Sequence, residues 1–146
     1  MQLYTLQDAQ AALDALAAAR EVTSTTAWNA AQALTHCAQS IAYSVQGYPE
    51  YKPTLVRRTI GPVVVKRMLA RETLGHGLTA PVPGAPPLDA AVTVASAVAE
   101  VRRAITLFEN ATTLAEHFVF GRLDRAAFDR FHAMHLAEHL SHLRWS

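Results

Sequence analysis

The stretch STTAWNAAQALTHCAQSIAYSVQG, residues 24–47, decides the fold class. Its apolar side chains recur mostly every three or four residues, at Trp28, Ala31, Leu34, Ala38, Ile41, Tyr43 and Val45. This spacing is the period of an amphipathic helix. A serine and two threonines at its start are possible N-caps, and Gly47 is a stop signal. The sequence therefore predicts a long helix over about 26–46.

Three further segments have the same helical period: residues 6–20, residues 92–113, and a last segment from residue 124 to about residue 143. Thr5 and Asp8 have the spacing of a capping box at the first of these helices. Asp124 is placed to cap the last. Four long helices and few β-branched runs predict an all-α protein, an antiparallel-type four-helix bundle in which residues 1–146 form a single domain.

A long excursion separates the second and third long helices. Residues 54–72 are interrupted by Gly61 and Pro62, and we expect two short helical pieces because no other strand is available to pair with this segment. The following stretch GHGLTAPVPGAPPLD, residues 75–89, contains three glycines and four prolines and is expected to be irregular. A long loop of this kind in a small domain often lies over a functional cleft.

The composition excludes several classes of protein. About half of the 146 residues are apolar, so disorder is not expected. Thirteen basic residues face twelve acidic ones, which gives no electrostatic reason to expect nucleic acid. No apolar stretch reaches the length of a membrane span, no signal-peptide pattern opens the chain, and the single cysteine excludes an internal disulfide. We expect a cytoplasmic protein without membrane or nucleic-acid partners.

Histidines gather in the stretch FHAMHLAEHLSHLRWS, residues 131–146, at His132, His135, His139 and His142. At about 100° per residue, all four fall within a sector of roughly 80° on a helix. His135 and His139 have the i, i+4 spacing at which two rings on one helix converge on one metal ion. A third ligand must come from another helix. His36 is the natural candidate, because an imidazole without a partner among its apolar neighbours would be costly.

Other interpretations of these residues compete with a metal site. The residues HLAEH match H-x-x-E-H, the inverted zinc-protease signature, in which the glutamate is a general base. The chain is too short for the catalytic domains of such proteases, but Glu138 remains a candidate base beside the metal. Cys37 lies about 100° from His36 on its helix and is expected to be a small buried residue. Alternatively, the imidazoles pair only with one another and with backbone carbonyls, and a chelator then leaves the melting temperature unchanged.

Three segments together carry a family resemblance: AWNAAQALTHCAQSIAYSVQGYPEYKP (27–53), GHGLTAPVPGAP (75–86) and HAMHLAEHLSHL (132–143). They resemble the DinB/YfiT-like superfamily of small proposed metalloenzymes and, more narrowly, a bacterial branch of unknown function. The resemblance covers the chain from about residue 5 to residue 143. Its most specific parts are Trp28, eight positions before His36, and the final His135-x-x-x-His139.

This resemblance implies a four-helix bundle with a three-histidine site, at His36, His135 and His139, for a divalent metal that is usually zinc or nickel. It implies a metal-dependent enzyme, such as a thiol-dependent transferase or a hydrolase, that acts on a small-molecule substrate or a low-molecular-weight thiol and is often a homodimer. His76, in the proline- and glycine-rich loop, is a second candidate catalytic residue beside Glu138. The alternative is a non-catalytic metal-binding or stress-related bundle, in which a further histidine completes the coordination.

Overall fold

The computed structural model describes residues 1–74 and 79–146, and it is mostly helical. Its elements are the 3-10 helix η1 (Leu6–Ala9), α1 (Gln10–Ala18), β1 (Val22–Ser24), α2 (Ala30–Gln46), α3 (Thr54–Arg58), α4 (Ile60–Arg71), α5 (Val94–Asn110), α6 (Arg125–Ser141) and β2 (Leu143–Trp145). The predicted helical class is therefore confirmed in its main part. A short two-stranded ribbon, which was not predicted, is added to it.

Helix α2 begins later than its sequence pattern predicts. Asn29 is the N-cap: its side chain accepts a hydrogen bond from the Gln32 N–H at 2.9 Å, and the Gln32 side chain accepts one from the Asn29 N–H at 3.0 Å. The predicted cap by Ser24 or the following threonines is wrong, because Ser24 lies in β1. Gly47 ends the helix as predicted, with a φ of 95° that favours glycine.

The other predicted caps are confirmed. The Asp8 carboxylate accepts a hydrogen bond from the Thr5 N–H at 2.9 Å, and Asp124 accepts one from the Ala127 N–H at 2.8 Å. The first helix starts as the 3-10 turn η1, and α5 is shorter at both ends than its periodic segment. Capping residues thus marked the starts of the first and last helices correctly.

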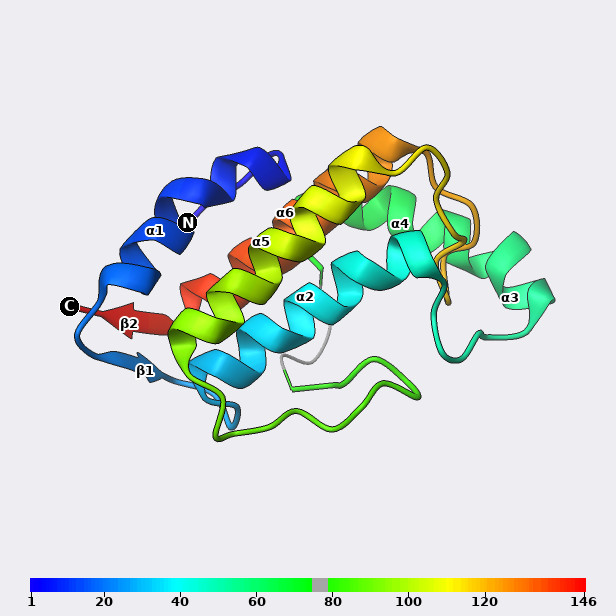
Figure 1. Ribbon diagram of the computed structural model, residues 1–146. Coiled ribbons are helices and arrows are strands. Elements are labelled where there is room, and N and C mark those ends of the chain that lie inside the picture. Colours follow the sequence, from blue (N-terminus) through cyan, green and yellow to red (C-terminus); the bar gives the residue numbers. More distant parts are fainter. Residues whose placement is uncertain (75–78) are drawn as a thin grey trace.

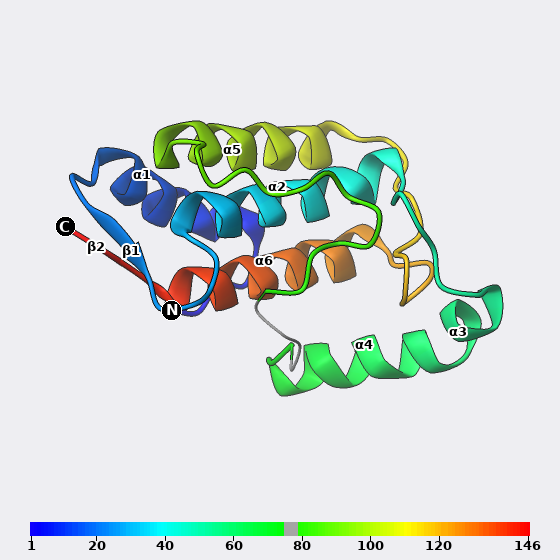
Figure 2. The same cartoon turned by 90° about the horizontal axis from the view of Figure 1, so that it is seen from below.

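Helices α2 and α5 lie side by side and run in the same direction, whereas α6 runs in the opposite direction (Figures 1 and 2). The excursion between α2 and α5 returns the chain to the end at which α2 begins, so the two helices are parallel. The predicted antiparallel arrangement thus applies to α6 but not to this pair. The main core lies among these helices and η1–α1, and includes the fully buried Leu13, Leu34, Ile105 and Leu136.

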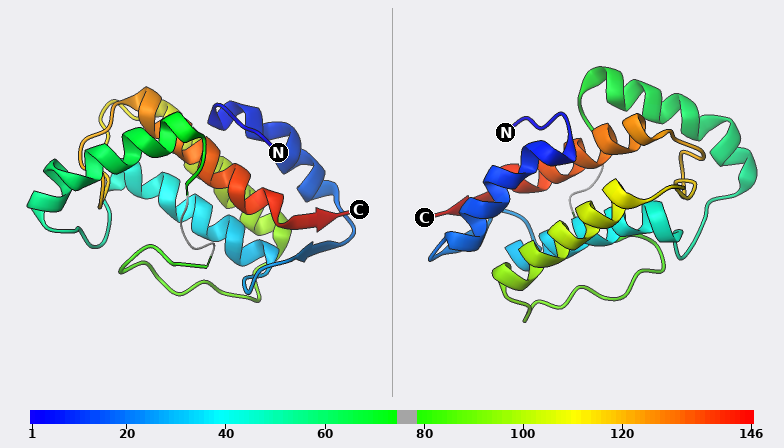
Figure 3. Two further views of the ribbon diagram at one scale, coloured as in Figure 1. Left: turned by 180° about the vertical axis from the view of Figure 1, so that it is seen from behind. Right: turned by 45° about the horizontal axis from the view of Figure 1, so that its top comes forward.

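Helix α6 is the central helix. Every residue from Phe131 to Ala137 is buried. On one side the Leu6 N–H donates to the Asp129 carboxylate at 2.7 Å and ties η1 to α6. Helix α4 lies along the side of α6 that faces away from α5 (Figures 2 and 3). A second, smaller apolar cluster fills that side, formed by Val65, Leu74, Phe120, Phe131 and Met134.

The unpredicted ribbon lies at one end of the helical array (Figures 1 and 2). Strand β1 pairs antiparallel with β2, so that Val22 lies opposite Trp145 and Ser24 lies opposite Leu143 (Figure 1). Each strand has three residues, which is too short for a period-two pattern to be recognised. The pairing ties the C-terminal residues to the connection between α1 and α2.

The predicted pair of short helices is confirmed, with a different boundary. The break lies at Thr59, between α3 and α4, and not at Gly61 and Pro62. Pro62 lies in the first turn of α4. Backbone N–H groups in a first turn make no intrahelical hydrogen bond, so the absence of an N–H on proline costs nothing there. Within the described ranges, no helix is both long enough and apolar enough to span a bilayer.

Gly61 permits close contact between α4 and the segment that precedes α6. A Cβ at this position would lie 2.1 Å from the Val119 carbonyl oxygen and 2.9 Å from the Phe120 Cα. We expect Gly61→Ala to lower the free energy of unfolding by about 2–3 kcal/mol through overpacking, although the same change in an open helix would raise it by up to about 1 kcal/mol. Urea unfolding measures the effect.

Val63→Ala on the same helix is the matched control, because Val63 is 51% exposed. We expect its unfolding midpoint to stay close to that of the wild type. An unchanged midpoint for Gly61→Ala would show that α4 moves away from Val119 at no cost, which would contradict the tight packing.

Candidate metal centre

Three buried histidines meet between α2 and α6. His36 comes from α2, and His135 and His139 come from successive turns of α6. The Nε2 atom of His135 lies 3.1 Å from that of His36 and 3.2 Å from that of His139. One ring nitrogen from each residue lies within 4.8 Å of the other two. The structure therefore brings together all three residues that the sequence predicts as ligands.

Two of the three distances between the nitrogens are close to those expected around a shared cation. Two ligands held at about 2.0–2.1 Å from a metal at a tetrahedral angle lie ~3.3 Å apart. Hydrogen bonds alone account for the cluster less well, because the single proton or lone pair of the His135 Nε2 serves one neighbour, not two. Three lone pairs directed at one divalent cation satisfy all three rings at once. The residues present therefore fit a metal ion.

Aromatic rings hold the three imidazoles in place. The Trp28 indole is stacked on His139, with ring centroids 6.2 Å apart and planes at 15°, and it lies 5.0 Å from the His36 ring. Phe131 is stacked on His135 at 6.0 Å. These contacts restrict the orientation of each imidazole, as a preorganised metal site requires. The eight-residue spacing of Trp28 and His36 places the indole against histidines from both helices.

A cavity of about 440 Å³ adjoins the cluster on the side of His36 and His135, and His139 does not line it. Its walls come from α4, from residues 80–83 of the proline- and glycine-rich loop, and from residues 117–120. The predicted position of this loop over a cleft is confirmed for these residues. The arrangement leaves the cluster accessible to a small molecule from one side.

The other two histidines of the C-terminal stretch lie outside this cluster. His132 is buried between Phe128, on which it is stacked at 5.5 Å, and Phe108. This burial lowers the pKa of His132 to about 3. His142 shares a contact of 3.0 Å with the Thr25 hydroxyl through its Nδ1. Sharing a helical sector was therefore not sufficient to place these rings at the metal centre.

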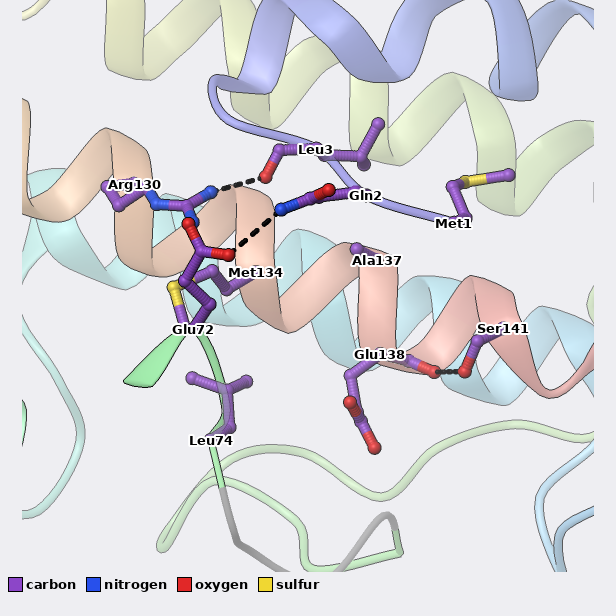
Figure 4. Close-up of a pocket in the computed structure, with 10 residues that line it drawn as sticks. All are labelled: Met1, Gln2, Leu3, Glu72, Leu74, Arg130, Met134, Ala137, Glu138 and Ser141. Carbon is purple, nitrogen blue, oxygen red and sulfur yellow. Dashed lines mark hydrogen bonds and ion pairs between the residues drawn. The ribbon is translucent and has the colours of Figure 1, made fainter. Parts of the chain in front are cut away.

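Glu138 lines a separate cavity of about 260 Å³, together with Gln2, Glu72 and Arg130 (Figure 4). Figure 4 shows its side chain extending from α6 on the side of Leu74, whereas Gln2 and Arg130 meet Glu72 and Leu3. Glu138 is not one of the three converging residues, so its role as a base stays a prediction.

Two other predicted positions differ in outcome. His76 lies outside the described residues. Cys37 is buried in the main core and is not part of the histidine cluster, as predicted. Burial raises the pKa of its thiol well above the usual range, which suits an unreactive packing residue.

Sequence reasoning missed His117, which it treated as part of a connector. His117 is buried and lines the same cavity as His36 and His135. Its Nδ1 accepts hydrogen bonds from the Val119 N–H at 3.1 Å and the Phe120 N–H at 3.2 Å. Burial, and to a smaller extent His132, lowers the pKa of His117 to about 3. The sequence signal that could have identified His117 is its position directly before three apolar residues, in HFVF.

Comparisons with known proteins give one match. No curated protein and no solved structure matches the chain. A family model described as "Protein of unknown function (DUF1569)" matches residues 1–145, a range that includes the three converging histidines, Trp28 and His117. Because that match spans almost the entire chain, the protein belongs to the DUF1569 family.

Proposed function

We propose that His36, His135 and His139 bind a divalent metal ion, zinc or nickel, and that the protein is a metal-dependent transferase or hydrolase. The observation that carries this proposal is the convergence of three buried Nε2 atoms beside an open cavity. A divalent cation bound there acts as a Lewis acid and lowers the pKa of a water molecule or thiol that it binds.

The residues around the cluster orient its imidazoles and leave one side accessible. Neutral imidazoles do not offset the charge of a cation, so its electrostatic effect on a substrate stays strong. Trp28 covers His36 and His139, and the cavity gives access beside His135. The substrate therefore approaches from the side of α4 and of the 80–83 segment.

A broader relationship belongs to the same proposal. We infer that the family is a branch of the DinB/YfiT-like four-helix bundles, and the contact of Trp28 with His36 and His139 supports this because these residues form the most specific shared motif. A small-molecule substrate or low-molecular-weight thiol, a homodimer and a cytoplasmic location are parts of this proposal.

Cobalt substitution tests the open coordination position. We expect the visible absorption spectrum of the cobalt-loaded, untagged protein to change when 2-mercaptoethanol is added, since a thiol has access to a three-histidine site. The non-catalytic alternative requires a fourth protein ligand and predicts an unchanged spectrum. Of the described residues, only three converge, which favours the enzyme. Cobalt-treated His135→Ala protein is the control and is expected to lack the spectrum.

A further inference from the structure

The cavity beside the histidine cluster has a restricted chemistry. Among its described lining residues, the polar side chains other than His36 and His135 are Ser40 and His117. The remaining described walls are apolar, among them Val64, Met68, Val82, Phe120 and Phe131. In the metal-free protein, a carboxylate or an ammonium group buried against such walls would lose its hydration without gaining an opposite charge. Without a bound metal ion, the described walls of the cavity therefore select against charged ligands.

His117, which lines this cavity, carries a hydrogen-bond donor on its ring. Its Nδ1 accepts from two backbone N–H groups, so the proton of the neutral ring is on Nε2. No described residue accepts a hydrogen bond from that Nε2–H. The ring is stacked on Phe120 at 4.2 Å.

The backbone of His117 is also fixed. His117 exchanges backbone hydrogen bonds of 2.8 and 3.1 Å with Gly121, and a Cβ on Gly121 would lie 2.4 Å from the Arg57 carbonyl oxygen. The position of the His117 ring is therefore fixed. The ring lies beside Phe120 in the wall of the cavity that His36 and His135 also line.

We propose that this cavity binds an uncharged organic substrate with an apolar body and an oxygen acceptor, and that the His117 Nε2–H donates a hydrogen bond to that oxygen. The acceptor is a carbonyl, ether or hydroxyl oxygen. His117 is a positioning residue that orients the substrate beside His36 and His135. The reactive role of the bound molecule rests on the proposed metal-dependent function, whereas its binding does not.

Three probes of similar shape separate the elements of this proposal: 2-acetylnaphthalene, which has a carbonyl acceptor, 2-ethylnaphthalene, which has none, and 2-naphthoate, which is charged. We expect the metal-free protein to bind the ketone at least tenfold more tightly than the carboxylate. The imidazole Nε2–H resonance of His117 in the wild-type protein is expected to shift when the ketone is added, and to shift much less with the hydrocarbon.

Two substitutions at His117 separate the donor from the backbone contacts. His117→Asn retains an acceptor near the position of Nδ1 and removes the distal donor, whereas His117→Gln retains a donor near Nε2. We expect His117→Asn to weaken ketone binding about five- to tenfold and hydrocarbon binding less than twofold. His117→Gln is expected to restore most of the affinity for the ketone. Equal weakening of both ligands by His117→Asn would overturn the role of His117.

A matched pair on α4 locates the binding site. Val64 lines the cavity and is 39% exposed, and its neighbour Val63 is 51% exposed and does not line it. We expect Val64→Trp to reduce binding of 2-acetylnaphthalene at least tenfold and Val63→Trp to leave it unchanged. Equal effects of the two substitutions would overturn the assignment of the cavity.

Measurements on metal-loaded and metal-free protein distinguish this proposal from the proposed function. Ketone binding that depends on His117 supports the cavity assignment, whether or not the protein binds metal stoichiometrically. Failure of the ketone to bind in either form, or binding of 2-naphthoate to the metal-free protein as tight as that of the ketone, overturns the cavity assignment and leaves the metal proposal intact.

Discussion

Replacement of His135 by alanine is expected to abolish stoichiometric metal binding and to lower the melting temperature of the metal-supplied protein by about 10 °C. The His135 Nε2 lies within 3.2 Å of the Nε2 atoms of both His36 and His139, so its removal leaves two ligands on separate helices. Metal at about a thousand times its Kd stabilises the folded protein by about 4 kcal/mol. One kcal/mol corresponds to about 2–4 °C in a chain of this size.

Metal analysis of untagged protein and thermal melts with and without a chelator measure this effect. His142→Ala is the matched control, since His142 follows α6 directly but contacts Thr25 and lies outside the cluster. It is expected to retain both metal and melting temperature. Full metal content in His135→Ala would contradict the site. A melting temperature of the wild type that is indifferent to the chelator would favour imidazoles that pair only among themselves.

The second large effect is a stabilising one, from His132→Leu. His132 is 1% exposed, and neither of its ring nitrogens has a hydrogen-bond partner among the described residues. A buried polar group in this state costs about 1–3 kcal/mol. Leucine has a similar volume and no polar atom, so we expect the free energy of unfolding at pH 7 to rise by about 1–3 kcal/mol.

The gain from His132→Leu is expected to increase as the pH falls. Burial lowers the pKa of His132 to about 3 from its ordinary 6.5. Below pH 6.5 the unfolded chain takes up a proton that the folded protein excludes, so wild-type stability falls by up to about 1.4 kcal/mol per pH unit until about pH 3. Leucine removes this loss. The advantage of the variant therefore grows by about 2 kcal/mol between pH 7 and pH 5.

Urea unfolding of metal-free protein at the two pH values measures this gain. His117, whose pKa is also lowered to about 3, is present in wild type and variant, so its own loss largely cancels in the difference. His142→Leu is the control and is expected to show no increase of this size. A gain that does not depend on pH, or a net loss of stability, would show that the folded protein hydrogen-bonds the His132 ring.

The sequence alone determined the helical class and singled out the three histidines that converge between α2 and α6. Periodic apolar positions and local capping residues such as Asp8 and Asp124 act over a few neighbours, so they can be recognised without the tertiary structure. The i, i+4 spacing of His135 and His139 likewise follows from the geometry of one helix. His36 could be added because a histidine in an apolar helical stretch requires a partner.

Only the tertiary structure decided the direction of α5 relative to α2, the pairing of Val22 with Trp145, and the different surroundings of the histidines. A helical wheel gives an angle around one axis, but the central part of α6, residues 131–137, is buried on all sides, so that angle does not say which neighbour a ring meets. His132 meets two phenylalanines, whereas His135 meets His36. His117 lines the same cavity as His36 and His135, although it lies far from His36 in the sequence and no local pattern links the two. Contacts between distant segments depend on how the helices pack, and packing is a property of the whole chain.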